Sequence, residues 1–426
     1  MKDHEKPSVR ASLILEAFEK TWEKLFDSPV HLDTALSQVP LAYKSILAQI
    51  LPAILARPVS WAEQLGVGVP EGEPWSLNAS ELKHWPQARW MAARMYAIMA
   101  NPSPPLVALP EDFPTWMIRA WELAWGSTDE LVQSLAAPAG LSLRASRKIG
   151  AQGLLAALKA ENALPVSAEC SSIVPFGVRL GGYASVLKTQ AYQRGHFEIQ
   201  DEGSQWMACF ALWPELFQDG LQMRPGKVSK FNTGTLPSLP SSLKIIDACA
   251  GAGGKTLAMA DALRGRGRFF AYDTSIKKLQ ALKRRATRAG LTNIQTCHLT
   301  EGQETEILAA YESSADLVLV DAPCSGWGVL RKNPDLKWRQ TADVVTRLTE
   351  VQARLLSLYA PLVKPQGRLV YGVCTFGWNE TREQVDNFLK NHPEFSVLSG
   401  GFLGPSPCDG FFVQAFQKNE KKPQTL

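Results

Sequence analysis

Paired cysteines, long apolar runs and a leader-like N-terminus are all missing from this sequence of 426 residues. Its seven cysteines include no CxxC pair, so their spacing fits neither a zinc site nor a disulfide framework. No apolar run reaches the roughly 18 residues that a membrane-spanning helix requires. The first residues, MKDHEKPSVR, lack the apolar segment of a signal peptide. We therefore expect a cytoplasmic protein with reduced thiols, no metal and no membrane partner.

The charge is modest and unevenly distributed. Apolar residues make up 45% of the chain and charged residues 20%, as in ordinary globular proteins, and the length allows two or three domains. Residues 1–130 hold 11 Lys/Arg and 16 Asp/Glu, whereas the remainder holds 34 and 25. The basic remainder indicates a polyanionic partner, although an excess of this size is also compatible with a role in solubility alone.

The first 204 residues predict two small domains. Apolar residues recur at helical spacing within Leu13–Leu25 and again within Trp90–Met99, so residues 1–130 are interpreted as a helical docking or scaffold domain. Short strand patterns at Ser142–Arg144 and Gly177–Leu180 flank a helical pattern at Ala151–Glu161. Residues 131–204 are therefore expected to form a small α+β linking subdomain.

From residue 205 to 426, strand and helix patterns alternate, which is the signature of a doubly wound parallel sheet. We predict an α/β fold with a Rossmann-like core in this third domain. The expected strands are Leu243–Ile246, Phe269–Tyr272, Ile294–Cys297, Leu317–Val320 and Arg368–Val373, with a further apolar stretch at Gly410–Phe416. The expected helices are Lys255–Leu263, Ser275–Ala289, Thr341–Tyr359 and Glu380–Lys390.

Two cysteines follow neighbouring strands of this predicted sheet. Asp321 comes directly after the fourth strand, and Cys324 stands three residues later in the loop DAPCSG. Cys374 comes directly after the fifth strand. Because parallel strands end at the same edge of a sheet, both thiols could face one site there. A buried structural cysteine in a turn remains the alternative interpretation for each of them.

The loop Gly251-Ala252-Gly253-Gly254-Lys255-Thr256 follows the first strand. It is not a P-loop, since Cys249 stands where the first glycine would be, and it is not a dinucleotide GxGxxG, since Thr256 stands where the last would be. Glycines that allow close backbone approach also suit S-adenosylmethionine. Asp273, about 20 residues further on, has the offset of a ribose-binding acid. The expected cofactor-binding residues are Cys249, Ala250, Gly251, Ala252, Gly253, Gly254, Lys255, Asp273 and Asp321.

Several motifs together carry a family resemblance. DACAGAGGKT, VDAPCSGWGVLRKNPDLKW, LVYGVCTF and DGFFVQAF resemble the RNA cytosine-C5 methyltransferases of the NOL1/NOP2/Sun group, and FPTWMIRAW, LSLRASRK and FEIQDEGSQ resemble the segments that precede their catalytic core. The resemblance by motif covers residues 110–416. With its long helical N-terminus, the chain is similar to the bacterial 16S rRNA members that carry a NusB-like domain.

The resemblance implies a covalent mechanism. Carbon C5 of cytosine is a poor nucleophile until a thiolate adds at C6. By analogy with the family, Cys374 is that nucleophile, Cys324 assists release of the enzyme, and Asp321 binds the N3/N4 edge of the base. The resemblance also implies that S-adenosylmethionine is the methyl donor and that the partner is RNA, in particular 16S rRNA, bound by a monomer. The target base must leave its stack to be reached.

Some positions depart from the family pattern. Family members usually have proline at the position of Ala252, and their acidic Glu-Asn-Glu survives here as Glu380-Thr381-Arg382. No aspartate follows the third strand, where Cys297-His298-Leu299-Thr300 stands. A catalytically weak relative that acts as an RNA-binding assembly factor is therefore an alternative function, and methylation of DNA or a small molecule is another.

The helix expected at Ser275–Ala289 offers a candidate RNA-binding face. Its spacing places Ile276, Leu279, Leu282 and Ala286 on the core side, and it groups Lys277, Arg284 and Arg288 on another side. These three basic residues either contact RNA phosphates or belong to an ordinary solvated face.

Overall fold

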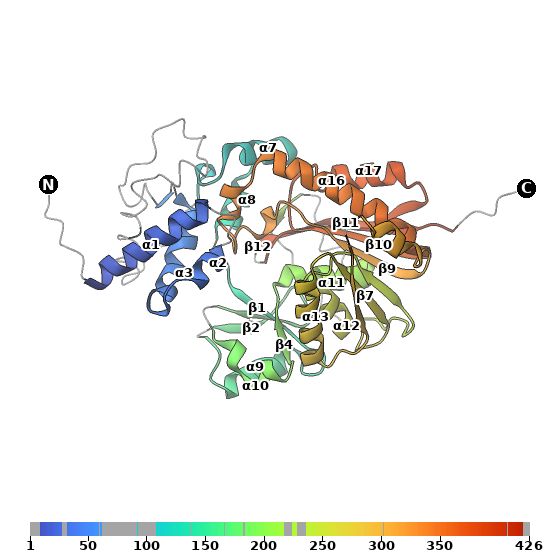
Figure 1. The fold of residues 1–426 in the computed structure, drawn as a ribbon, viewed down its shortest axis with the longest axis horizontal. Coiled ribbons are helices and arrows are strands. Elements are labelled where there is room, and N and C mark those ends of the chain that lie inside the picture. Colours follow the sequence, from blue (N-terminus) through green and yellow to red (C-terminus); the bar gives the residue numbers. More distant parts are fainter. Residues whose placement is uncertain are drawn as a thin grey trace, which may run out of the picture. The chain divides into compact units, whose positions relative to one another are not determined.

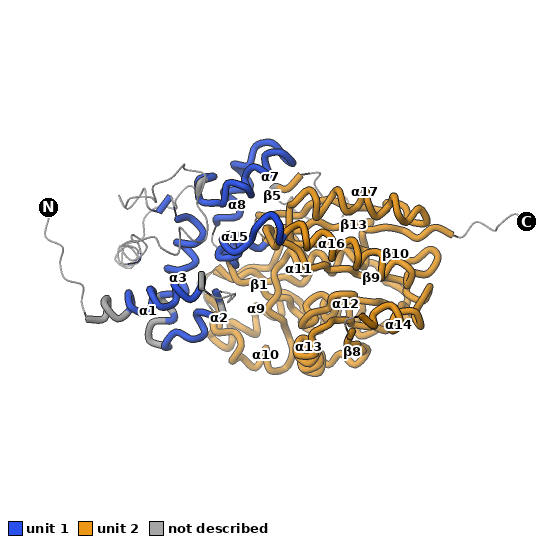
Figure 2. Tube along the Cα trace, turned by 45° about the horizontal axis from the view of Figure 1, so that its top comes forward, with its two compact units in different colours: residues 1–138, 329–344 blue, residues 139–328, 345–426 orange. Residues whose placement is uncertain are grey.

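The computed structural model of the chain describes residues 9–27, 32–58, 60–61, 92, 108–137, 139–165, 167–181, 184–216, 224–227, 236–300, 302–406 and 408–420. The chain forms two compact units (Figure 2). Unit 1 contains residues 1–138 and 329–344, and unit 2 contains residues 139–328 and 345–426. The division at residues 130 and 204 stays a prediction. Except for residue 92, the expected helix at Trp90–Met99 lies outside the described residues.

Unit 1 is built of helices in the part that the structure describes. The apolar spacing around Phe18 and Trp22 does form a helix, and both side chains are buried in a common core with Leu47 and Leu51. The helices of unit 1 are α1 (Val9–Asp27), α2 (Leu32–Ser37), α3 (Leu41–Ala56), α7 (Thr115–Trp125), α8 (Asp129–Ala136) and α15 (Leu336–Arg339), with a 3-10 turn η1 at Pro110–Asp112.

The short helix α15 belongs to unit 1 although its sequence directly follows a loop of unit 2. The Trp338 indole Nε1 donates a hydrogen bond to the carbonyl of Leu55 at 2.8 Å. The Lys337 Nζ donates to the carbonyls of Ala56 at 2.8 Å and Asp112 at 2.6 Å. Burial lowers the pKa of Lys337 to about 7. The run RKNPDLKW therefore forms part of the core of unit 1.

Unit 2 begins with a small antiparallel sheet in the order β2-β3-β1-β4. Alternate residues such as Leu143 and Val178 point into a core that Leu154 and Phe197 complete. The elements of this subdomain are β1 (Leu141–Ala145), α9 (Gly150–Ala160), β2 (Ala168–Cys170), β3 (Gly177–Leu180), η2 (Val186–Lys188), α10 (Gln190–Gln193) and β4 (Phe197–Ile199).

The rest of unit 2 is a seven-stranded sheet in the order β11-β13-β10-β9-β6-β7-β8. The strands from β10 to β8 are parallel, whereas β13 pairs antiparallel with both β10 and β11. The strands are β6 (Lys244–Asp247), β7 (Arg268–Asp273), β8 (Ile294–His298), β9 (Ala315–Asp321), β10 (Val363–Val373), β11 (Phe395–Leu403) and β13 (Phe411–Lys418). A separate parallel pair joins β5 (Gly226–Lys227) to β12 (Pro405–Ser406).

Helices cover both faces of this sheet. Figure 1 shows α16 and α17 along one face and α11, α12 and α13 along the other. The arrangement is that of a Rossmann-like core, as predicted. The helices and turns are α11 (Glu202–Leu212), η3 (Pro214–Leu216), α12 (Gly254–Ala262), α13 (Ile276–Ala289), α14 (Glu304–Ala309), η5 (Trp327–Val329), α16 (Ala342–Tyr359), η6 (Ala360–Leu362) and α17 (Arg382–Asn391).

Two expectations need correction. The sheet is not parallel throughout, because the chain ends in the antiparallel pair β11 and β13, and β11 was not foreseen. Ile276 is 53% exposed rather than part of the core. It is the first residue of α13, directly after the Ser275 N-cap, and the buried face of the helix begins only at Leu279.

Within the described residues, no helix is both long enough and apolar enough to cross a membrane.

Candidate active site

Polar loops meet at the carboxyl edge of the parallel strands. The backbone joins them directly, since Ala250 N–H donates to the carbonyl of Tyr272 at 2.9 Å and Ala322 N–H donates to the carbonyl of Gly372 at 3.0 Å. Ligands of open α/β sheets bind at this edge. It therefore holds the glycine loop after β6, Asp273 after β7, Asp321 and Cys324 after β9, and Cys374 after β10.

The glycine loop has a backbone that needs glycine at two positions. Gly251 and Gly253 have φ angles of 55° and 87°, a region that side-chain-bearing residues rarely adopt. A Cβ atom at position 253 would also lie 2.4 Å from Cγ of Leu282, whereas one at position 251 would meet nothing within 4 Å. The loop is thus packed against α13 at Gly253 and open at Gly251, which suits the close approach of a ligand.

Asp273 supports this loop with both carboxylate oxygens. Its Oδ2 accepts a hydrogen bond from Gly251 N–H at 2.9 Å, and its Oδ1 accepts one from Ser275 N–H at 2.7 Å. Each oxygen keeps a second lone pair. Asp273 can therefore hold the loop in place and still accept hydrogen bonds from two ribose hydroxyls.

Asp247, the last residue of β6, was not identified from the sequence. It is 1% exposed, and its Oδ2 accepts a hydrogen bond from the Thr256 hydroxyl at 2.6 Å. Burial raises the pKa of Asp247 to about 7, and burial likewise raises the pKa of the nearby Cys249 thiol. An acid that directly ends a strand was the available signal. Through its hydrogen bond with Thr256, this carboxyl fixes the start of α12, directly after the glycine loop.

Arg285 supports the loop from α13. Its Nη1 donates to the carbonyl of Ala252 at 2.6 Å, and its Nε donates to Oε2 of Glu198 at 3.0 Å. Glu198 lies on β4 of the small subdomain and also pairs with Arg288. The carbonyl of Ala252, the position where family members usually have proline, is therefore held by a guanidinium.

Lys255 and Asp321 connect the glycine loop to the loop after β9. Their Nζ and Oδ2 atoms are 2.5 Å apart in a largely buried ion pair. Burial opposes the charge of Lys255, but the Asp321 carboxylate outweighs it and raises the pKa of the lysine. The sequence indicated both residues as cofactor-binding and gave no sign that they contact each other.

The two cysteines predicted to share a site lie in contact. The Sγ atoms of Cys324 and Cys374 are 3.4 Å apart. The hydrogen bond with Cys374, together with burial, raises the pKa of Cys324. Every cysteine that the structure describes is a free thiol. The carboxylate of Glu380 accepts hydrogen bonds from Ser325, the residue after Cys324. The sequence suggested Glu380 only as a remnant of a family motif.

The chemistry of these residues fits S-adenosylmethionine. The open backbone at Gly251 allows a large ligand to approach, and Asp273 offers acceptors for the ribose. Within the described part of the chain, no cluster of His, Cys, Asp and Glu side chains could hold a metal ion. The site therefore combines a glycine loop with two adjacent thiols and a carboxylate.

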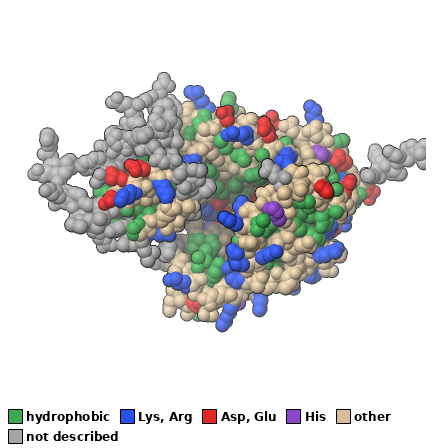
Figure 3. All heavy atoms as spheres, viewed as in Figure 1, with side chains coloured by type: hydrophobic (Ala, Val, Ile, Leu, Met, Phe, Trp, Pro, Cys, Tyr) green, Lys and Arg blue, Asp and Glu red, His purple; other side chains and the backbone are tan. Residues whose placement is uncertain are grey.

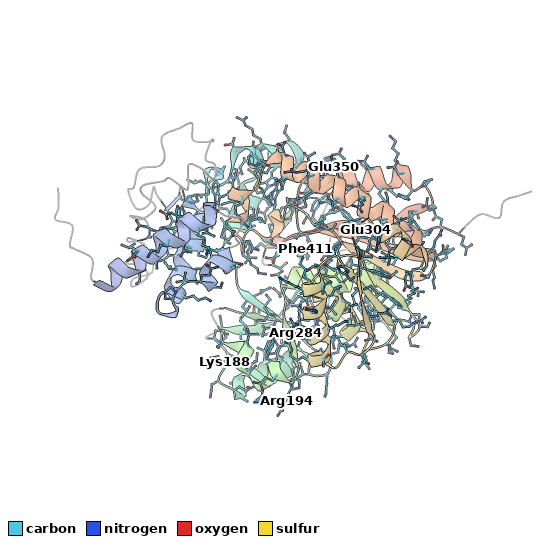
Figure 4. All side chains as sticks on the ribbon, in the orientation of Figure 1. Lys188, Arg194, Arg284, Glu304, Glu350 and Phe411 are labelled. Atoms are coloured by element: carbon cyan, nitrogen blue, oxygen red, sulfur yellow. The ribbon has the colours of Figure 1, made fainter. Side chains whose placement is uncertain are left out.

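The basic face of α13 is smaller than expected. Arg288 lies over the ring of Tyr192 at 3.9 Å and is ion-paired with Glu198, so it is engaged inside unit 2. Lys277 and Arg284 remain exposed. Lys and Arg side chains gather on the face shown in Figure 3 over α13 and the small sheet. Among them, Lys188, Arg194 and Arg284 are labelled in Figure 4.

The sequence of the chain resembles those of known methyltransferases. The family model described as 16S rRNA methyltransferase RsmB/F matches residues 238–411. A probable ribosomal RNA small subunit methyltransferase B from Synechocystis is 31% identical over 328 residues, which cover 72% of this chain and 67% of the relative.

Solved structures share the fold. The crystal structure of PH0851 has a TM-score of 0.68 at 20% identity, over 98% of this chain and 100% of that one. NSun6 from Pyrococcus horikoshii, solved with SFG, has a TM-score of 0.58 at 17% identity, over 72% of this chain and 99% of that one. Both resemble the present chain in fold.

Proposed function

The chain belongs to the RsmB/F family of S-adenosylmethionine-dependent rRNA methyltransferases, and on that premise we propose that it methylates C5 of a cytosine in small-subunit ribosomal RNA. In this proposal Cys374 forms a transient covalent bond with C6 of the base. The observation that carries the proposal is the contact between two thiols, Cys324 and Cys374, at the carboxyl edge of the sheet.

Cys374 would act as the nucleophile. Its thiolate adds to C6, and the electron pair of the C5–C6 double bond is then available at C5 as an enamine. C5 takes the methyl group of S-adenosylmethionine, which leaves as S-adenosylhomocysteine. The C5 proton then passes to water, its bonding electrons re-form the C5–C6 double bond, and the C6–S bond breaks to release the Cys374 thiolate. Cys324, in contact with the same sulfur, is in position to assist that last step.

Asp321 would orient the base. One of its oxygens is occupied by Lys255, and the other can accept a hydrogen bond from the exocyclic N4 amino group. This contact would favour cytosine over uracil, whose O4 cannot donate.

The glycine loop and Asp273 would hold S-adenosylmethionine. Backbone around Gly251 would approach the nucleoside and methionine parts, while the free lone pairs of Asp273 would accept from the ribose. The other residues proposed to contact the cofactor are Cys249, Ala250, Ala252, Gly253, Gly254 and Lys255.

The protein would bind the RNA as a monomer, on the basic side of unit 2. Exposed Lys188, Arg194, Lys277 and Arg284 belong to η2, the end of α10 and α13. Such side chains bind phosphates without selecting sequence, and the target base is reached only after it leaves its stack.

Methylation of purified small-subunit rRNA tests the proposal directly. We expect the protein and S-adenosylmethionine to introduce 5-methylcytosine at one position, detected by bisulfite sequencing, and we expect cells without the gene to lack it. Binding of both RNA and cofactor without any new 5-methylcytosine would refute the proposal and favour an assembly factor.

A further inference from the structure

Glu380 is fully buried, at 0% exposure. It accepts four hydrogen bonds. Ser325 donates to it twice, from its N–H at 2.8 Å and from its hydroxyl at 2.5 Å. Gln352 Nε2 donates at 3.0 Å and the Thr375 hydroxyl at 3.1 Å. A buried carboxylate with this many donors is held in one orientation.

The donors belong to the two loops that carry the cysteines. Ser325 directly follows Cys324, and Thr375 directly follows Cys374. Their hydroxyl oxygens are 2.6 Å apart, so they also contact each other. Glu380 is therefore the common acceptor of both loops.

Helix α16 adds a third connection. Gln352 Nε2 donates to Glu380 and also to the carbonyl of Pro323, the residue before Cys324, at 2.9 Å. The backbone of Glu380 is itself held, because the hydroxyl of Tyr371 donates to its carbonyl at 2.7 Å. The acceptor is thus anchored to β10 as well as to the helix.

The charge of Glu380 acts on Cys324. The hydrogen bond with Cys374 and burial raise the pKa of Cys324 most, and electrostatic interactions with Cys374 and Glu380 raise it further. Burial also raises the pKa of Glu380, while its hydrogen bonds from Ser325, Gln352 and Thr375 oppose that rise. A protonated Cys324 can donate a hydrogen bond to its partner sulfur.

We propose that Glu380 is a positioning residue, whose carboxylate locks the loop of Cys324 to the loop of Cys374 and so holds the two thiols in contact. The assignment of nucleophile and release roles to these thiols rests on the proposed function. The positioning itself does not, and it can be tested on the free protein without RNA or cofactor.

Diamide cross-linking measures the contact between the thiols. Diamide accepts two electrons and two protons as the two Sγ atoms form a disulfide. Mass spectrometry of peptides identifies the bond. We expect rapid Cys324–Cys374 cross-linking in the wild type and a rate lower by on the order of tenfold in Glu380→Ala, because lost orientation slows reaction between neighbouring groups. Glu202→Gln, which neutralises another buried glutamate that is paired with Arg179, should cross-link like the wild type.

Glu380→Gln separates the charge from the packing. It keeps the shape of the side chain, and the alkylation of Cys324 by iodoacetamide should then reach its midpoint at a lower pH than in the wild type. Binding of S-adenosylmethionine should be unchanged in this variant. If Glu380→Ala does not fold, Ser325→Ala removes one of the four hydrogen bonds to Glu380, that of the Ser325 hydroxyl, and should also slow cross-linking.

The inference is overturned if Glu380→Ala cross-links at the rate of the wild type. If Glu380→Ala does not fold, it is overturned if Glu380→Gln and Ser325→Ala both cross-link at the rate of the wild type. Failure of the proposed function would give a different experimental result. In that case the free wild-type protein would still cross-link faster than the Glu380 variants, although no RNA would be methylated.

Discussion

The sulfur atoms of Cys324 and Cys374 lie 3.4 Å apart, although 50 residues separate them in the chain. They meet because β9 and β10 are parallel neighbours, in register from Leu317 with Arg368 to Asp321 with Gly372. Each cysteine follows the last residues of its strand, so the register alone brings the two loops together.

The two thiols should fail in opposite ways. Cys374→Ala removes the proposed nucleophile, so neither methyl transfer nor a covalent RNA adduct should occur. Cys324→Ala should still add and methylate but release poorly, so that protein remains bonded to methylated RNA. Denaturing electrophoresis shows this species as a band shifted by the mass of the RNA.

Exposed Cys170 provides a matched control for the thiol variants, because Cys170→Ala should behave like the wild type. In alkylation experiments, Cys374 should react faster than Cys209, whose pKa burial raises to about 12. An adduct that accumulates in Cys374→Ala and disappears in Cys324→Ala would reverse the two roles.

Asp273→Ala should weaken binding of S-adenosylmethionine. The variant loses the ribose acceptor and also the support of Gly251 N–H, and hydrogen bonds to a charged group contribute about 1.5–3 kcal/mol. Calorimetry should therefore show a dissociation constant raised roughly 10- to 150-fold. Asp343→Ala, at an exposed position at the start of α16, is the control. An unaltered constant with intact circular dichroism would remove Asp273 from the ribose site.

Arg285→Ala should also reduce cofactor affinity, although Arg285 is not expected to touch the cofactor. Its guanidinium holds the carbonyl of Ala252 in place, and a loop without this bond must be ordered at the moment of binding. We expect calorimetry to show a loss of about three- to tenfold, as for one hydrogen bond. The neighbouring Arg284→Ala should have no effect on the cofactor. Equal affinities in the two variants would show that the bond to Ala252 is unimportant.

Lys277 and Arg284 should contribute to RNA binding through phosphates. Replacing both by glutamate should weaken binding and reduce the slope of log affinity against log salt by about two, since each phosphate contact contributes roughly one. The exchange of the exposed Arg347 and Lys390 for glutamate makes the same change in net charge elsewhere in unit 2. If both double variants have the same salt slope, the effect comes from net charge alone and α13 is an ordinary solvated helix.

Lys337 should make the stability of unit 1 depend on pH. Its pKa is about 7 in the folded protein against an ordinary 10.5, so between these values the unfolded chain binds more protons and stability rises with pH. Below about pH 7 the cost of the buried charge is fully present. Urea unfolding from pH 6 to 10 should show this rise in the wild type.

The variant Lys337→Met should lose that part of the pH dependence and keep the remainder. Lys20→Met, which changes an exposed lysine of α1, should retain the full dependence. If wild type and Lys337→Met have parallel stability curves, Lys337 is charged in the folded protein at neutral pH.

The sequence by itself determined the local elements and the residue types at the strand ends. Strands such as β6 and β7 were predicted to within about two residues, because short apolar runs between turn residues specify buried strands locally. The glycine loop was also recognisable locally, since Gly251 and Gly253 mark backbone that other residues rarely adopt. Parallel topology then implied that Asp321, Cys324 and Cys374 belong to one edge.

Tertiary structure alone decided which side chains touch. Burial of Glu380, the ion pair of Lys255 with Asp321, and the engagement of Arg288 by Glu198 all join residues from different elements. The same is true of Lys337, which lies in α15 after a loop of unit 2 and is buried in unit 1. Residue spacing along one helix or strand carries no information about such partners, because a charged side chain is exposed or buried according to what packs against it from elsewhere in the chain.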